Sequence, residues 1–293
     1  MSSNQTRRSL LKNFALGAAA AIVPAVPFAA KNEINKKLKL KGNINHSVCR
    51  WTYSFLSLDE LCNAVKKIGF NAIDLVGPKD WTVLKTHGVF SSMCNGAEIS
   101  LTEGWNNKQY HSTLIKNYAA HIELVTKAGY KNLICFSGNR NGMDDETGLK
   151  NSVDGLKQIL ALAEKKGVII QMELLNSKVN HKDYMCDRSK WGVELCKRLG
   201  SQNFKLLYDI YHMQIDEGDV IRTIKDNHEY FGHYHTAGVP GRHEINDTQE
   251  LYYPAIMRAI KETGFKNFVA QEFIPTGENK MASLKEAIKI CDV

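Results

Sequence analysis

The 293-residue chain lacks the cysteine spacing of a disulfide framework or a zinc finger. Its seven cysteines are an odd number and include no Cys-x-x-Cys pair. Cys49, Cys94 and Cys135 lie inside apolar runs, where a free thiol behaves as a small hydrophobic side chain. The pattern argues against a disulfide scaffold in a chain of this size and contains no catalytic cysteine signature.

The sequence also lacks a strong charge of one sign. Of the net charge of +7, Arg7, Arg8 and Lys12 supply +3 ahead of the first acidic residue, Glu33, which leaves +4 for the remainder. A body with so mild a charge does not indicate a nucleic-acid partner. A third absence is a Gly-x-Gly-x-x-Gly loop after the first expected strand, residues 44–49.

The N-terminus has the composition of an export signal. Residues 6–12 (Thr-Arg-Arg-Ser-Leu-Leu-Lys) resemble the twin-arginine consensus, and an Ala-rich apolar stretch follows at 14–30. Pro24 and Pro27 interrupt that stretch, which argues against a membrane-spanning helix and leaves an uncleaved hydrophobic anchor as the alternative. We therefore expect periplasmic or other export through the twin-arginine machinery. The expected segments are an export signal at 1–30, a charged linker at 31–43 and one domain at 44–293.

Strand and helix patterns alternate eight times from residue 44 onward. Strands are expected at 44–49, 72–76, 89–94, 132–136, 168–176, 204–210, 230–236 and 268–274, and helices at 58–67, 81–87, 111–127, 149–166, 188–199, 219–230, 251–263 and 283–291. A capping box begins the first helix at Ser57, and Gly129, Gly167 and Gly200 stand where three helices should end. Eight such units in about 250 residues predict a single-domain α/β fold, a (β/α)8 TIM barrel. An open doubly wound sheet is the alternative, although it usually has fewer strands and a glycine-rich loop.

Four consecutive predicted strands carry a metal-type ligand late in the strand. Glu173, Asp209, His235 and Glu272 are separated by 36, 26 and 37 residues, about one strand-helix unit each. Side chains at the carboxyl ends of barrel strands converge at one mouth. Three carboxylates would repel one another in a dry pocket unless a divalent cation lay between them. Three oxygen ligands and one imidazole suit Mn²⁺, Mg²⁺ or Co²⁺; the alternative is a polar barrel mouth without a metal.

Further polar residues flank the four candidate ligands. His233 shares a barrel face with His235 but lies deeper, which favours a hydrogen-bonded interior histidine. His212, Arg242 and Asn176 follow the strands and are candidate substrate contacts, Arg242 because a guanidinium pairs with a carboxylate. A plain surface role for each loop residue is the alternative, and Trp51 is either a pocket wall or a packing residue.

The most specific stretches are residues 172–176 (Met-Glu-Leu-Leu-Asn), 207–214, 232–244 and 271–275. With them, the chain from 44 to 291 resembles the xylose isomerase-like TIM barrel superfamily of sugar phosphate isomerases and epimerases, most closely the hydroxypyruvate isomerases. The resemblance implies that Glu173, Asp209, His235 and Glu272 hold one divalent metal ion, Mn²⁺ or Mg²⁺ first and Co²⁺ or Zn²⁺ as alternatives. It also implies that Glu173 and Glu272 are the acid/base pair and that His212 and Arg242 contact substrate. One departure concerns His235: some hydroxypyruvate isomerases carry Gln there, whereas ketose 3-epimerases carry His.

The expected chemistry is proton transfer next to a carbonyl through an enediolate. The first expectation is an isomerase that converts hydroxypyruvate to tartronate semialdehyde or acts on a similar small hydroxycarbonyl compound. Alternatives are a ketose 3-epimerase and a lyase or hydratase acting on a 3-keto sugar. An endonuclease is disfavoured by the mild charge, and an exported non-catalytic sugar-binding protein by the two glutamates, since a binder needs no bases. Expected partners are the small substrate, the export machinery and a second copy of the chain; nucleic acid is not expected.

Overall fold

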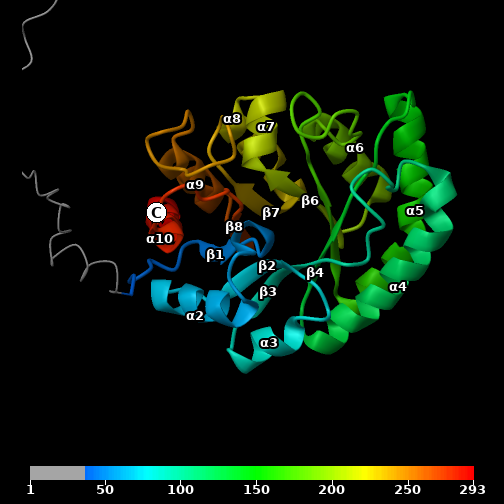
Figure 1. Cartoon of the computed structure of the whole chain (residues 1–293). Helices are drawn as coiled ribbons and strands as arrows, with labels where there is room; N and C mark the ends of the chain where they lie inside the picture. Colours follow the sequence, from blue (N-terminus) through cyan, green and yellow to red (C-terminus); the bar gives the residue numbers. More distant parts are fainter. Residues whose placement is uncertain (1–36) are drawn as a thin grey trace, which may run out of the picture. The chain divides into compact units, whose positions relative to one another are not determined.

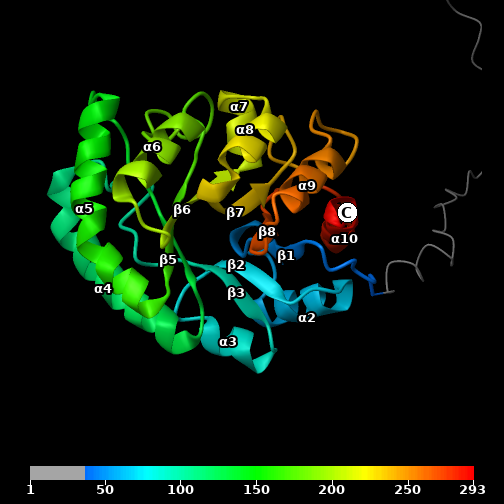
Figure 2. The ribbon, with the colours of Figure 1, turned by 180° about the vertical axis from the view of Figure 1, so that it is seen from behind.

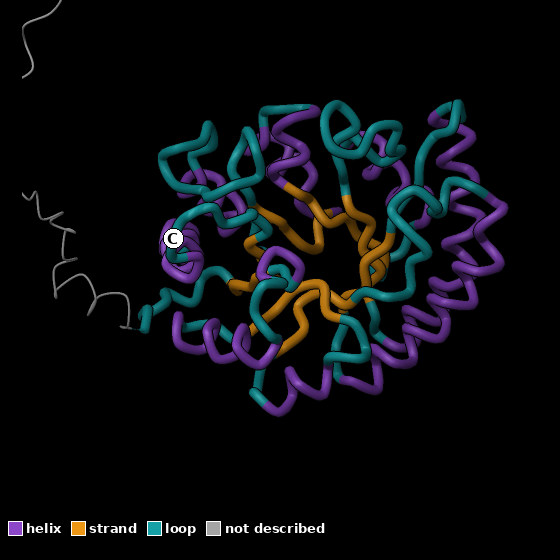
Figure 3. The backbone as a smooth tube through the Cα atoms, in the orientation of Figure 1, coloured by secondary structure: helices purple, strands orange, loops and turns teal. Residues whose placement is uncertain are grey.

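A computed structural model describes residues 37–293, which form a barrel of eight parallel strands with the helices outside it (Figures 1 and 3). The strands are β1 (Asn45–Val48), β2 (Ala72–Val76), β3 (Phe90–Cys94), β4 (Asn132–Cys135), β5 (Ile169–Glu173), β6 (Phe204–Asp209), β7 (Phe231–Thr236) and β8 (Phe268–Gln271). The α-helices are α2 (Leu58–Ile68), α3 (Trp81–Thr86), α4 (His111–Ala128), α5 (Asp145–Lys166), α6 (Ser189–Leu199), α7 (Ile210–Asp216), α8 (Val220–Asn227), α9 (Tyr253–Glu262) and α10 (Lys280–Cys291). Short 3₁₀ helices are η1 (Trp51–Tyr53), η2 (Lys108–Tyr110) and η3 (His228–Tyr230). The predicted TIM barrel is confirmed.

The strands follow the order β1-β8-β7-β6-β5-β4-β3-β2 around the barrel. Between β1 and β2 the only backbone pairing in the described chain is an isolated parallel bridge of Cys49 and Asp74. There the backbone N–H of Arg50 donates to the carbonyl oxygen of Asp74 over 3.0 Å. The barrel is therefore nearly closed, and Asp74 lies at its seam.

The helices pack on the outside of the strands through apolar stripes. In both ribbon views α4 and α5 run side by side along the outer surface (Figures 1 and 2). In α2 the predicted capping box is present: the Ser57 side chain accepts from the backbone N–H of Glu60, and the Glu60 carboxylate accepts from the backbone N–H of Ser57. The inner face of α2 buries Leu58, Leu61, Cys62, Val65 and Ile68. Local sequence thus fixes both where this helix begins and which side faces the barrel.

The main differences from the predicted helices are at α5 and α7. Helix α5 begins at Asp145, earlier than the predicted start at 149, because the side chain of Asp144 accepts from the backbone N–H of Thr147 and caps it. Polar residues form this first turn, so hydrophobic periodicity does not reveal it. Helix α7 directly follows β6 and was not predicted; it places His212 in a helix rather than on a loop.

Part of the predicted linker lies against the barrel. The backbone N–H of Leu38 donates to the carbonyl oxygen of Ile68 over 2.8 Å, and that of Lys41 donates to the Asp292 carboxylate. The predicted export signal at 1–30 lies outside the described residues. None of the helices between residues 37 and 293 combines the length and apolar character that a membrane crossing requires.

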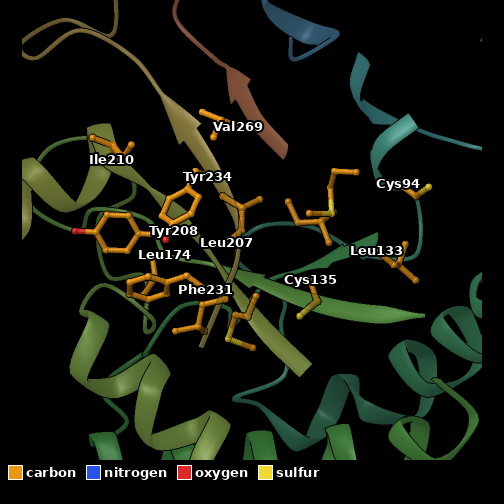
Figure 4. Close-up of a cluster of buried hydrophobic side chains, with 14 of the residues drawn as sticks. Cys94, Leu133, Cys135, Leu174, Leu207, Tyr208, Ile210, Phe231, Tyr234 and Val269 are labelled. Atoms are coloured by element: carbon orange, nitrogen blue, oxygen red, sulfur yellow. The ribbon is translucent and has the colours of Figure 1, made fainter. Parts of the chain in front are cut away.

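The apolar core fills the space between the strands and the helices. Figure 4 shows Tyr208, Phe231 and Tyr234 grouped close to Leu207, and the ring centroids of Tyr208 and Phe231 are 4.6 Å apart. All seven cysteines are free and buried, as expected for small hydrophobic side chains. This packing holds the strands in a fixed register, and the strand ends therefore present their side chains at defined places.

Candidate active site at the carboxyl end of the barrel

The structure brings the four predicted ligand residues together. Glu173 and Asp209 are the last residues of β5 and β6, His235 is the penultimate residue of β7, and Glu272 directly follows β8. One ligand atom from each residue lies within 4.8 Å of those of the other three. All four residues are at least 95% buried. The structure thus brings together the four side chains that their spacing along the chain placed at one mouth of the barrel.

His235 is hydrogen-bonded at both ring nitrogens. Its Nδ1 lies 3.1 Å from Glu173 Oε1 and 2.9 Å from Glu272 Oε2, and its Nε2 lies 2.8 Å from Asp74 Oδ2. Burial by itself lowers the pKa of His235, but the Glu272 carboxylate and the bond to Asp74 hold that pKa well above its ordinary value. The imidazole therefore connects the cluster at the mouth to a carboxylate deeper in the barrel.

Asp209 uses one oxygen to begin α7. Its Oδ1 accepts from the backbone N–H groups of Tyr211 and His212, over 2.8 Å and 3.2 Å. This cap fixes the carboxylate, and Oδ2 lies 3.4 Å from Nη2 of Arg242. Burial, with the charge of Glu272, raises the pKa of Asp209 to about 8 although Arg242 opposes the shift. Negative charge in this cluster is thus unfavourable without a neighbouring cation.

Arg242 closes one side of the cluster. Its Nη2 lies 2.5 Å from Glu272 Oε2, and its guanidinium faces the rings of Trp51 and Tyr211 at 5.2 Å and 5.3 Å from their centroids. Burial raises the pKa of Glu272, but Arg242 and His235 outweigh it and hold the pKa well below its ordinary value. The buried Nε of Arg242 has no hydrogen-bond partner within residues 37–293. The structure thus places Arg242 beside the four candidate ligands.

Asn176 and His212 form a bonded pair at the edge of the cluster. Asn176 Oδ1 accepts from the backbone N–H groups of Val179 and Asn180, so its Nδ2 is the donor toward Nδ1 of His212, 2.5 Å away. Burial, reinforced by Arg242, holds the pKa of His212 well below its ordinary value. The neutral ring therefore carries its proton on Nε2, which lies 3.6 Å from Asp209 Oδ2 and has no hydrogen-bond partner in the described chain.

Asn176 has no free hydrogen-bonding group for a substrate. Its Oδ1 accepts from two backbone N–H groups, and its Nδ2 donates to Asn180 Oδ1 as well as to His212. An amide nitrogen has two hydrogens, so both are used. In this geometry Asn176 orients His212, and the direct substrate contact of Asn176 stays a prediction.

Two residues of the site were not identified from the sequence. Asp74, in the middle of β2, is fully buried against His233 and His235. Its sequence signal is an acidic residue inside the apolar run Ala-Ile-Asp-Leu-Val, in the middle of the strand rather than at its carboxyl end. Trp51, expected to be either a pocket wall or a packing residue, donates its indole N–H to Glu272 Oε1 over 2.8 Å. His233 is interior as predicted, 3.0 Å from Asp74 Oδ1.

The donor set fits one divalent cation. Three carboxylates and one imidazole, with ligand atoms within 4.8 Å of one another, match the ligand preferences of Mn²⁺, Mg²⁺ and Co²⁺. The two ring nitrogens of His235 face different groups, and Nδ1 is the one on the side of Glu173 and Glu272. The residues present are therefore suited to a metal ion at this position.

Comparisons with known proteins agree with this architecture. The family model for the xylose isomerase-like TIM barrel matches residues 62–291, and the chain therefore belongs to that family. A 2-oxo-tetronate isomerase of Cupriavidus necator is 35% identical over 113 residues, which are 39% of this chain and 43% of that enzyme. A human protein named "Putative hydroxypyruvate isomerase" is 26% identical over 126 residues, 43% of this chain and 46% of its own length. The chain thus spans less than half the length of these two relatives.

Solved structures extend the likeness to the whole fold. The structure of D-psicose 3-epimerase with D-tagatose from Clostridium cellulolyticum H10 superposes with a TM-score of 0.70. The superposition covers 85% of this chain and 100% of the epimerase at 16% sequence identity. At that identity the likeness concerns the barrel alone.

Proposed function

We propose that this protein is a metal-dependent isomerase that moves a proton next to the carbonyl group of a small hydroxycarbonyl substrate. The observation that carries the proposal is the convergence of Glu173, Asp209, His235 and Glu272 within 4.8 Å of one another at the carboxyl end of the barrel. Its named relatives include a 2-oxo-tetronate isomerase, whose name describes chemistry of this kind.

Glu173 and Glu272 are the proposed acid/base pair. Their carboxylates come from different strands and meet at the same ring nitrogen of His235. One glutamate removes the proton beside the carbonyl and the other delivers a proton to the former carbonyl carbon, while the hydroxyl proton passes to the former carbonyl oxygen; the result is an isomerisation through an enediolate. A divalent cation bound to Glu173, Asp209, His235 and Glu272 would supply a positive charge that stabilises the developing negative charge on the substrate oxygens.

Arg242 and His212 are the proposed substrate contacts. The Nε of Arg242 and the Nε2 of His212 are buried donors without partners in the described chain. A substrate with a carboxylate and a neighbouring hydroxyl or carbonyl oxygen would satisfy both donors. These contacts favour a small 2-keto acid, and hydroxypyruvate, converted to tartronate semialdehyde, is the first candidate.

A second candidate is a ketose 3-epimerase. The imidazole of His235 favours it, because ketose 3-epimerases carry His at this ligand position. In that reaction the two glutamates would act on opposite faces of one carbon rather than on neighbouring carbons. A lyase or hydratase acting on a 3-keto sugar would also remove a proton beside the carbonyl and form an enolate.

We further propose that the protein is exported by the twin-arginine route. Arg7, Arg8 and the apolar stretch at 14–30 motivate this proposal. That route carries folded proteins, and it would suit an enzyme that acquires its metal before export.

A proton-exchange screen in D₂O tests the proposed function. The purified protein with Mn²⁺ is incubated with hydroxypyruvate, 2-oxo-tetronate and free ketoses, and ¹H NMR after removal of the paramagnetic ion follows deuterium at the carbons beside the carbonyl. We expect exchange with at least one 2-keto acid, and its loss after chelation. Binding of these compounds without any exchange would instead indicate a non-catalytic sugar-binding protein.

A further inference from the structure

Asp74 lies in an irregular part of β2, at the seam of the barrel. The register between β2 and β3 shifts on both sides of Asp74, and the next residue, Leu75, has a φ of +57°. A branched or bulky residue other than glycine rarely adopts this left-handed backbone conformation. Strand irregularities of this kind re-aim side chains and are common beside active sites. The irregularity accompanies a carboxylate that points into the barrel rather than toward the helices.

Both oxygens of the Asp74 carboxylate are engaged inside the barrel. Oδ2 lies 2.8 Å from Nε2 of His235, and Oδ1 lies 3.0 Å from Nε2 of His233. The hydroxyl of Ser92 also donates to Oδ1, over 2.5 Å. Burial raises the pKa of Asp74, but His233 and His235 outweigh it and lower that pKa below its ordinary value. An ionised carboxylate in a fully buried position requires such partners.

We propose that Asp74 is a positioning residue that accepts the Nε2 proton of His235 and thereby leaves Nδ1 as the metal-binding nitrogen. A neutral imidazole has a single N–H, and the partner of one nitrogen decides which nitrogen keeps a lone pair. When a cation occupies the cluster, with the proton of the neutral ring held at Nε2 by Asp74, the Nδ1 lone pair of His235 would bind that cation in place of the contacts Nδ1 makes to Glu173 and Glu272. The inference rests on the proposed metal-dependent function, and it assigns a role to a residue outside the four proposed ligands.

The contact also fixes the orientation of the ring. His235 is fully buried, and its two ring nitrogens face opposite groups, the cluster at the mouth and Asp74 below it. Without the carboxylate, the ring would lose the acceptor that distinguishes one nitrogen from the other. Ligand-orienting partners of this kind typically change metal affinity by about 10- to 100-fold.

Binding of Mn²⁺ by isothermal titration calorimetry tests the proposal. The proteins compared are the wild type, Asp74→Asn and Asp292→Asn as a matched control. Asp292 also lies beside a buried histidine, 3.6 Å from Nε2 of His46. His46 is near the amino end of β1, whereas the proposed metal site lies at the carboxyl ends of the strands. We expect Asp74→Asn to weaken Mn²⁺ binding by about 10- to 100-fold and Asp292→Asn to change it by less than about threefold. Turnover by Asp74→Asn should recover as Mn²⁺ is raised, since the reacting groups are intact.

A second measurement requires no variant. In the diamagnetic Mg²⁺-loaded wild type, ¹⁵N NMR of the histidine rings should detect a slowly exchanging proton on Nε2 of His235 and none on Nδ1. Protonation at Nδ1, or wild-type affinity in a folded Asp74→Asn protein, would overturn the inference while the proposed function stands. Two Mn²⁺ ions per chain, one of them lost in Asp74→Asn, would overturn it in favour of a second metal site. If the wild type binds no divalent ion, the proposed function itself fails and the inference fails with it.

Discussion

Trp51 donates its indole N–H to Oε1 of Glu272 over 2.8 Å, although the two residues follow the first and last strands of the barrel. Glu272 is buried, whereas Trp51 is 42% exposed. The same indole ring faces the guanidinium of Arg242, which itself contacts Glu272 Oε2. A half-exposed aromatic residue at the mouth therefore donates a hydrogen bond to one oxygen of a proposed catalytic carboxylate and holds that oxygen in place.

Replacing Trp51 by Phe tests this relationship. Phe keeps an aromatic face for Arg242 but cannot donate to Glu272. Because a hydrogen bond to a charged group contributes roughly 1.5–3 kcal/mol, we expect kcat/KM for substrate proton exchange to fall by roughly tenfold or more. Phe55→Leu is the control, since Phe55 is also exposed and follows η1 but contacts Lys280. Equal rates for Trp51→Phe and wild type would mean that the bond does not orient Glu272.

The two glutamates should be separable as bases and as ligands. Glu173→Gln and Glu272→Gln are each expected to lower kcat by about 10²–10⁴-fold, the usual effect of removing a general acid or base. Gln retains a carbonyl oxygen, so part of the Mn²⁺ affinity should survive, as calorimetry can measure. In an epimerase, one variant could retain solvent exchange with a single epimer. Full activity of either variant would remove that glutamate from the proton transfer.

Metal binding should stabilise the fold. Glu173, Asp209 and Glu272 place three carboxylates in one buried cluster, and a divalent cation would relieve their repulsion. At a free Mn²⁺ concentration 100 times the Kd, we expect about 2.7 kcal/mol of added stability, which raises Tm by about 5–10 °C. Differential scanning fluorimetry with and without chelator measures the shift. No shift with Mn²⁺, Mg²⁺, Co²⁺ or Zn²⁺ would argue against a metal centre.

Glu244 should make stability depend on pH. Burial raises its pKa, but hydrogen bonds from Gly277 and Thr276 lower it to about 2. Since the unfolded value is about 4.3, the ionised side chain stabilises the fold fully above that pH, and its contribution disappears as pH falls toward about 2. The difference in unfolding free energy between wild type and Glu244→Gln should therefore be larger at pH 7 than at pH 3 in urea titrations. Glu278→Gln, at an exposed position on the loop that carries Thr276 and Gly277, is the control; a constant difference would contradict the assignment.

Export depends on the paired arginines in the twin-arginine hypothesis. Changing Arg7 and Arg8 together to Lys keeps the charge but removes the motif. The precursor should then remain in the cytoplasm, as cell fractionation and immunoblotting can determine. Normal export of the double variant would exclude this route.

The sequence alone determined the barrel and the convergence of the four proposed ligand residues. Buried parallel strands have short apolar runs, and their carboxyl ends share one edge, so Glu173, Asp209, His235 and Glu272 could be placed together from spacing alone. The helix that follows Asp209 was missed because its first turn coincides with the end of the strand. The early start of α5 was missed because polar residues form its first turn.

Only the tertiary structure decided what each polar side chain contacts. Trp51 and Glu272 meet because β1 and β8 are neighbours in the barrel, a distance of 221 residues along the chain. Asp74 points at His235 because of a local irregularity in β2, and no sequence period describes an irregularity. Asn176 contacts His212 instead of solvent because its backbone neighbours use its carbonyl oxygen. Sequence periodicity fixes which face a residue occupies, whereas hydrogen-bond partners depend on distances that arise only when the strands pack.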